Sequence, residues 1–319
     1  MQNQNWQRVI VVAIAALSVV SFMTAAQALP LAGPNRPATV PSDYVITPFG
    51  YFDPSCVTHL AKGDVLRQDK ETIEHANGTY DNMPVCAYAH YTADGEQVTG
   101  DERAVQPPTI KHSWIAYGST TTTSAFGAFS TGWNVPAAPS KNDGQTVYLF
   151  NGLEDNSDVV TILQPVLGWN SDYGSAWGIA SWNCCQKGTV YEAPPAPVNS
   201  GDFIVGYIVD TCKAGTKTCS SWDVYTVDET NGNASELLKT SNFGQTFNWA
   251  FGGVLEVYNI VQCGDYPGGG RIDFYDQYLY DDKGVHIAKP AWKISNVSSK
   301  LTPKCGYGGS LPEEVILTY

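Results

Sequence analysis

Short apolar runs separated by turn residues recur along most of the chain. From Trp114 onward these runs are rich in β-branched and aromatic residues, and polar clusters such as Lys141–Gly144 and Asp228–Asn233 separate them. No run of a dozen residues shows a helical period. The runs predict strands over Ala125–Val135, Thr146–Phe150, Val159–Leu167, Trp177–Trp182, Asp202–Val209, Ser221–Val227, Thr246–Val261 and Arg271–Tyr280. This succession predicts an all-β fold, either an antiparallel β-sandwich of two packed sheets or a barrel.

The first residues have a different pattern. Arg8 precedes an apolar run over Val9–Met23, and small residues follow it up to Ala26-Gln27-Ala28. This order predicts a secretory signal peptide over residues 1–28, with cleavage after Ala28. A membrane anchor is disfavoured, because the run is near the lower length limit for a span and the cleavage site follows directly. We therefore expect a secreted, extracellular protein without a membrane anchor.

Composition divides the rest of the chain into two parts. Residues 29 to about 45 are rich in proline, residues 44–99 hold most of the histidines and many charges, and Gln106-Pro107-Pro108 marks a second break. Residues 29–108 are interpreted as a Pro-rich linker with an N-terminal pro-segment or accessory domain, in which Val85–His90 is a strand-like run. Residues 109–319 form the expected β-sandwich domain. A removable pro-segment and a permanent accessory domain would have the same sequence features, so both stay open.

Eight cysteines in an exported chain favour disulfides over metal ligation. The local pairs expected are Cys56 with Cys86 and Cys212 with Cys219, whereas the adjacent Cys184 and Cys185 are expected to bond to other partners. The five histidines are scattered without a ligand spacing. We therefore expect no metal and no cofactor.

The charge balance limits the partners. The formal net charge is -13 and the chain has only 18 lysines and arginines. Nucleic-acid phosphates and anionic membrane surfaces would be repelled, so both are excluded as partners. An acidic surface is compatible with work at low pH, and equally with ordinary solubility.

Two predicted strands each carry a hydrogen-bonding side chain inside an apolar run. Gln164 lies in the run Val159–Leu167, and Glu256 lies in the run Gly252–Tyr258. A carboxyl group on an apolar face loses hydration and its pKa rises, while a carboxamide stays uncharged and can both donate and accept. Such a pair suits acid–base work on a water molecule, although buried Gln and Glu side chains also commonly satisfy backbone groups.

The order of several short motifs carries a family resemblance. Asn134-Val135-Pro136 comes first, then Ile162-Leu163-Gln164, with Trp169 and Asp172 five and eight positions after the glutamine, and Gly201-Asp202 opens a later strand. The region from Trp114 to about Asp276 thereby resembles the glutamic peptidases of the eqolisin (scytalidoglutamic peptidase) group and, more loosely, the plant neprosins. The family also carries a Tyr-Glu-Trp segment, and its counterpart here, Ala180–Asn183, has no carboxylate.

The resemblance implies an antiparallel β-sandwich of two packed sheets, of the concanavalin A-like kind. It also implies a secreted acid endopeptidase that acts on polypeptides as a monomer, made as a zymogen. Glu256 would be the general base on a water molecule, and Gln164 would orient that water and donate to the oxyanion. Candidates for lining the substrate groove are Tyr148, Trp169 and Trp249, although aromatic residues in a sandwich are usually core.

Two other classes of protein remain as alternatives. One is a non-catalytic β-sandwich that binds carbohydrate or protein at a cell surface. The other is a sandwich-fold polysaccharide hydrolase, for which the nearest carboxylate pair is Asp273 with Asp276; their spacing puts the two on opposite faces of a strand. A Ser-His-Asp hydrolase is disfavoured because the chain has no Gly-x-Ser-x-Gly motif.

Overall fold

The described part of the chain is built almost entirely from β-strands. The computed structural model describes residues 35–98, 114–157, 161–241, 245–296, 303, 305–311 and 314–319. These residues contain no α-helix, only short 3-10 turns: η2 (Pro54–Cys56), η3 (Gln68–Lys70), η4 (Gln186–Gly188) and η5 (Cys263–Asp265). The predicted signal peptide and the predicted boundary at residue 108 lie outside the described residues. The fold class expected from the sequence is confirmed.

The first large sheet has nine strands and holds both candidate catalytic residues. Its order is β21 (Lys293–Asn296), β9 (Trp114–Thr121), β19 (Trp249–Tyr258), β11 (Thr146–Glu154), β12 (Ile162–Trp169), β13 (Trp177–Cys184), β14 (Val190–Glu192) and β3 (Val57–His59), with β15 (Ala196–Val198) also pairing with β13. The neighbours are antiparallel except β14 and β3, which run parallel.

The second large sheet has ten strands and packs on one face of the first. Its order is β22 (Gly308–Ser310), β23 (Val315–Thr318), β20 (Arg271–Asp281), β10 (Phe126–Asn134), β16 (Phe203–Asp210), β17 (Trp222–Asp228), β18 (Leu238–Thr240), β4 (Val65–Arg67), β5 (Thr72–Glu74) and β6 (Tyr80–Asn82). Large apolar side chains of both sheets, such as Leu167 and Phe274, form the core between them. The two sheets are the sandwich.

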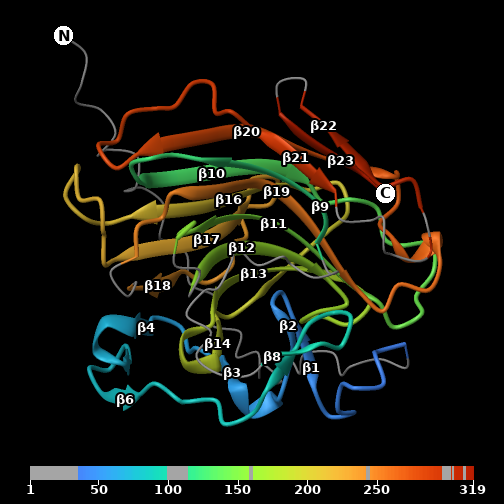
Figure 1. Ribbon diagram of the computed structural model, residues 1–319, viewed down its shortest axis with the longest axis horizontal. Helices are drawn as coiled ribbons and strands as arrows, with labels where there is room; N and C mark the ends of the chain where they lie inside the picture. The colour runs from blue at the N-terminus through green and yellow to red at the C-terminus, as the bar shows by residue number, and fades with distance from the viewer. Residues whose placement is uncertain are drawn as a thin grey trace.

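Residues 35–98, here called the N-terminal segment, attach to the sandwich in two ways. The strands β1 (Val45–Thr47), β2 (Gly50–Phe52), β7 (His90–Tyr91) and β8 (Gln97–Val98) form a small separate sheet. The strands β3 and β4 instead add to the edges of the two large sheets, each parallel to its neighbour. Figure 1 shows the segment, coloured blue to cyan, gathered beneath the curved strands β11, β12 and β13.

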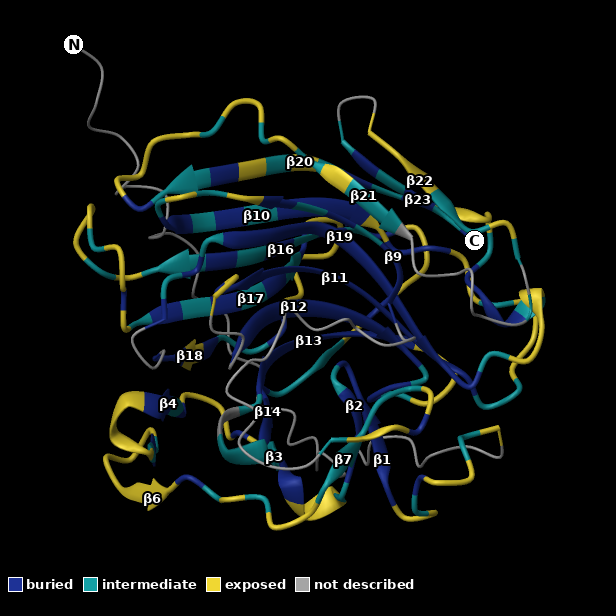
Figure 2. Cartoon of the chain, viewed as in Figure 1, coloured by how far each residue is buried: buried dark blue, intermediate teal, exposed yellow. Residues whose placement is uncertain are grey.

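The N-terminal segment covers the face of the nine-stranded sheet that the second sheet leaves free. Side chains such as Ile46 and Phe52 pack with Val166 and Val254 in one buried cluster. As a result β11, β12, β13 and β19 are buried along their whole length, as the dark strands of Figure 2 show. Strands covered on both faces need continuous apolar sequence, which is the pattern that these runs have.

The strands expected from Trp114 onward are all present, with ends that differ by a few residues. The expectation for Val85–His90 was wrong, since only His90 at its end is in a strand, β7. Val85 and Tyr88 are 65% and 56% exposed, so this run has no layer to pack against. Its apolar residues alone therefore do not form a strand.

Four disulfides join the cysteines. The two local pairs expected from the sequence, Cys56–Cys86 and Cys212–Cys219, are confirmed. The expectation that Cys184 and Cys185 bond elsewhere was wrong, because they bond to each other. Cys263 bonds to Cys305. All six cysteines outside the adjacent pair are therefore bonded to one another, and none is left to bond Cys184 or Cys185.

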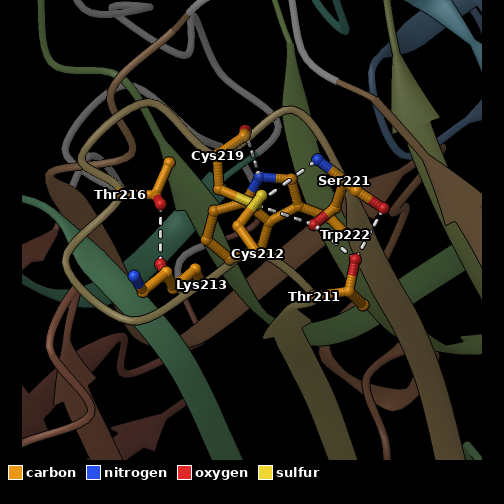
Figure 3. Close-up of a disulfide and its surroundings, with 7 residues drawn as sticks. All are labelled: Thr211, Cys212, Lys213, Thr216, Cys219, Ser221 and Trp222. Carbon is orange, nitrogen blue, oxygen red and sulfur yellow. Dashed lines mark hydrogen bonds between the residues drawn. A yellow bond between two sulfur atoms is a disulfide. The ribbon is translucent and has the colours of Figure 1, made fainter.

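The Cys212–Cys219 disulfide closes the turn between β16 and β17 (Figure 3). Trp222 lies beside it and donates its Nε1–H to the Cys219 carbonyl over 2.9 Å. The ring of Trp222 is 2% exposed and packs edge-on against Phe247, with 5.0 Å between ring centroids. This end of the sandwich is thus held by a covalent link and a buried indole.

Candidate active site

Gln164 lies on β12 with its side chain inside an apolar layer. It pairs with Trp182 on β13 and shares the face of its neighbours Ile162 and Val166, which pack against the N-terminal segment. The side chain is completely buried, and neither Oε1 nor Nε2 has a hydrogen-bond partner among the described residues. An unpartnered buried carboxamide costs about 1–3 kcal/mol, so folding alone does not account for a glutamine here.

Glu256 lies on β19, directly opposite Tyr148 on β11. It is completely buried. Its Oε2 accepts a hydrogen bond from Trp114 Nε1 over 3.0 Å, and its Oε1 accepts one from the Tyr258 hydroxyl. These contacts hold the carboxyl group on the face that the N-terminal segment covers.

The register shows how far apart the two candidates lie. Tyr148 pairs with Glu256 on one side and with Gly168 on the other, so these three share a face and a level in the sheet. Gln164 is four residues before Gly168 on β12. Four residues and two strand spacings correspond to about 16 Å between Cα atoms in a flat sheet. Gln164 and Glu256 therefore face the same layer at different levels of the sheet.

The three aromatic candidates do not all lie on this face. Tyr148 and Trp249 belong to the cluster under the N-terminal segment. Trp169 packs instead in the core between the two large sheets, edge-on to Trp177 with 5.3 Å between ring centroids. Because Trp169 is an odd number of residues from Gln164, the strand alternation puts it on the opposite face. The structure thus brings four of the five candidate site residues to one face.

The N-terminal segment contacts this face directly. The Tyr148 hydroxyl donates to the Ile46 carbonyl over 3.3 Å. The rings of Phe49 and Trp182 meet edge-on, with 6.4 Å between centroids, and the Tyr51 hydroxyl donates to Asn259 over 3.1 Å. Any ligand that reaches Gln164 and Glu256 has to displace these contacts.

Sequence reasoning missed a carboxyl pair at the edge of the same face. Ala180–Asn183 has no carboxylate of its own, but Glu192 pairs with Trp182 in it and Asp172 lies near Glu192. Burial raises the pKa of Glu192 to about 7, and burial together with the Glu192 carboxylate raises that of Asp172. His59 of the N-terminal segment places its Nδ1 2.7 Å from Glu192 Oε2. The signal that could have identified Glu192 is a carboxylate inside the short apolar run that begins at Val190.

A further carboxylate that sequence reasoning missed ends β11. Glu154 pairs with Ile162 on β12 and with Trp249 on β19, and it is 3% exposed. Burial, and then the neighbouring Asp155, raise the pKa of Glu154 to about 8. The strand predicted from the sequence ended at Phe150, so Glu154 lay outside it, whereas β11 extends to Glu154.

Within the described ranges, no group of three or more His, Cys, Asp or Glu side chains is arranged to hold a metal ion. Nor does any helix in those ranges have the length and hydrophobicity needed to cross a membrane.

The chain was compared with known proteins. No family model and no curated protein matches it. Among solved structures it is similar to scytalidoglutamic peptidase with a peptide-based transition-state analogue, at a TM-score of 0.47 and 17% identity over 65% of this chain and 98% of that chain. It is also similar to SCP-B, a member of the eqolisin family, in complex with the tripeptide Ala-Ile-His, at a TM-score of 0.46 and 17% identity over 65% and 98% of the two chains. A second structure of scytalidoglutamic peptidase, with a transition-state analogue inhibitor, has a TM-score of 0.46 and 16% identity over the same shares.

Proposed function

We propose that this chain is a secreted acid endopeptidase of the glutamic type, in which Gln164 and Glu256 act on a water molecule. The observation that carries the proposal is the buried, unpartnered carboxamide of Gln164, which faces the same covered layer as Glu256. The sequence motifs around Gln164 resemble those of glutamic peptidases and support the same assignment. Tyr148 and Trp249 lie on this face and would line the groove, whereas a substrate contact is not proposed for Trp169.

The proposed chemistry needs no covalent intermediate. Glu256 takes a proton from water as the water attacks the peptide carbonyl, and it returns that proton to the leaving amine. Gln164 donates an Nε2–H to the oxyanion that forms on the carbonyl oxygen. A neutral donor suits this role because it stays protonated at any working pH.

We also propose that the N-terminal segment covers the site until it is displaced or removed. Its residues Ile46 and Phe49 occupy the face that a substrate would need. The parallel pairings of β3 and β4 with the sheet edges would hold the rest of the segment in place. Acid treatment of the full chain should produce activity after a lag, and intact-mass measurement during the lag separates cleavage from displacement.

The experiment that tests the function is proteolysis of a denatured protein at pH 3–5. We expect cleavage that resists pepstatin and falls at least about 100-fold in Gln164→Ala and in Glu256→Gln, the usual range for loss of an oxyanion donor or a general base. Glu229→Gln, at an exposed turn, is the matched control and should keep full activity. Carbohydrate binding without proteolysis, before and after acid treatment, would instead indicate a non-catalytic binding module.

A further inference from the structure

We propose that Glu154 positions the catalytic carboxamide by donating its carboxyl O–H to Gln164 Oε1. This inference rests on the proposed function, because it assigns a task to a residue beside the proposed dyad. Glu154 is a positioning residue here, since it acts on Gln164 and touches no reacting atom.

The register brings the two side chains together. Glu154 pairs directly with Ile162, and Ile162 and Gln164 point to the same face of β12. Glu154 and Gln164 are therefore diagonal neighbours on adjacent strands, a relation that puts Cβ atoms about 7 Å apart and within reach of long side chains. Glu256, by contrast, lies two strands and four residues away.

Each group has the hydrogen-bonding capacity that the other lacks. Glu154 Oε2 and both polar atoms of Gln164 are buried without a hydrogen-bond partner among the described residues. The residues opposite Glu154 on both neighbouring strands, Ile162 and Trp249, carry no charge, and the carboxyl group that adds to the effect of burial on the pKa of Glu154 is Asp155. Since burial and Asp155 raise its pKa to about 8, Glu154 is a neutral acid at pH 3–5 and carries a proton to donate.

A carboxamide needs such a partner in order to act as an oxyanion donor. Its two ends have nearly the same shape, and a half-turn would exchange the N–H donors for an oxygen that repels the oxyanion. A donor fixed on Oε1 leaves the Nε2–H free to donate to the oxyanion. Closing this bond requires rotation of the Glu154 and Gln164 side chains toward each other within the covered layer.

The test compares two substitutions of Glu154 in the full chain. Glu154→Gln keeps an N–H donor at the same place, and we expect kcat within about 3-fold of the wild-type value. Glu154→Met keeps the volume without a donor, and we expect kcat to fall about 10- to 100-fold with KM within about 3-fold. Wild-type kcat in the Met variant, or an equal loss in the Gln variant, overturns the inference.

A spectroscopic measurement makes the test independent of turnover. The side-chain NH₂ resonances of Gln164 are identified by their absence in Gln164→Ala. In the wild-type protein they should shift with a midpoint near pH 8, as Glu154 ionises, and this shift should vanish in Glu154→Gln. Resonances that do not respond between pH 6 and 10 overturn the inference. If Gln164→Ala is fully active, the proposed function fails, whereas an inactive Gln164→Ala beside a fully active Glu154→Met refutes only the positioning role.

Discussion

At Gln164, the residue type that would give the greatest stability differs from the one that the proposed function needs. Its carboxamide is completely buried without a hydrogen-bond partner among the described residues. A side chain selected only for packing would be apolar at this position, as Ile162 and Val166 are on the same face. Such a conflict is typical of functional sites, where local rules are broken for the sake of chemistry.

Replacing this glutamine should therefore make the protein more stable. In a Glu154→Met background, where the proposed donor to Gln164 Oε1 is absent, we expect Gln164→Leu to raise the free energy of unfolding by about 1 kcal/mol, because the unpaired amide is replaced by a side chain of similar size. Urea denaturation at pH 5 measures this change, and the same variant should lose peptidase activity. A destabilised Gln164→Leu protein in this background would mean that a group other than Glu154 pairs with the carboxamide and that its burial is structural.

At the scale of elements, the N-terminal segment contains a histidine, His90, whose protonated form is disfavoured by burial. His90 on β7 stacks on Phe52 of β2, with 4.6 Å between ring centroids. Burial lowers the pKa of His90 to about 4. Its pKa in the folded protein is thus below the unfolded value near 6.5. Because the unfolded chain takes up a proton at His90 more readily than the folded protein does, the free energy of unfolding is at its full value above pH 6.5. It decreases as the pH falls toward 4.

Acid should therefore loosen the cover over the site. We expect amide hydrogens of β2 to exchange faster as the pH falls from 6.5 to 4, after correction for intrinsic rates, with a loss of local stability of at most about 3 kcal/mol. His90→Phe should suppress this change and lengthen the lag before acid activity. The control is His286→Phe, at an exposed position on the sandwich. Equal exchange in wild type and His90→Phe would exclude His90 as the acid-sensitive group.

At the scale of the whole molecule, buried carboxyl groups change the pH dependence of stability in the direction opposite to His90. Burial raises the pKa of Glu154 to about 8 and of Glu192 to about 7, and the half-buried Asp210 is raised to about 6. Each value exceeds that of the unfolded chain, near 4, so each stabilising contribution is complete below pH 4 and is lost as the pH rises through the folded value. The sandwich is thus more stable in acid, while its cover is less so.

This difference predicts the pH dependence of thermal unfolding. We expect the Tm of the sandwich to be highest near pH 4–5 and to fall toward pH 8, and the double variant Glu154→Gln, Glu192→Gln to have a flatter profile. Differential scanning calorimetry from pH 4 to 8 measures both. A wild-type Tm that rises steadily up to pH 8 would contradict the assignment of these two carboxyl groups as neutral in the folded protein.

The sequence by itself determined the local features of this protein. Alternating and continuous apolar runs identified the strands from Trp114 onward, because the period of side-chain direction in a strand is a property of the backbone. The same alternation selected Gln164 and Glu256 as polar groups on apolar faces, and short sequence separation indicated the Cys56–Cys86 and Cys212–Cys219 pairs.

Only the tertiary structure decided which faces meet and what covers them. It put Trp169 in the core between the sheets, brought Glu154 beside Gln164, and laid the N-terminal segment over the face that both candidates share. These relations depend on the register between strands and on layers far apart in sequence. A shift of one residue in register moves every side chain of a strand to the other face of the sheet, and no local pattern specifies that register.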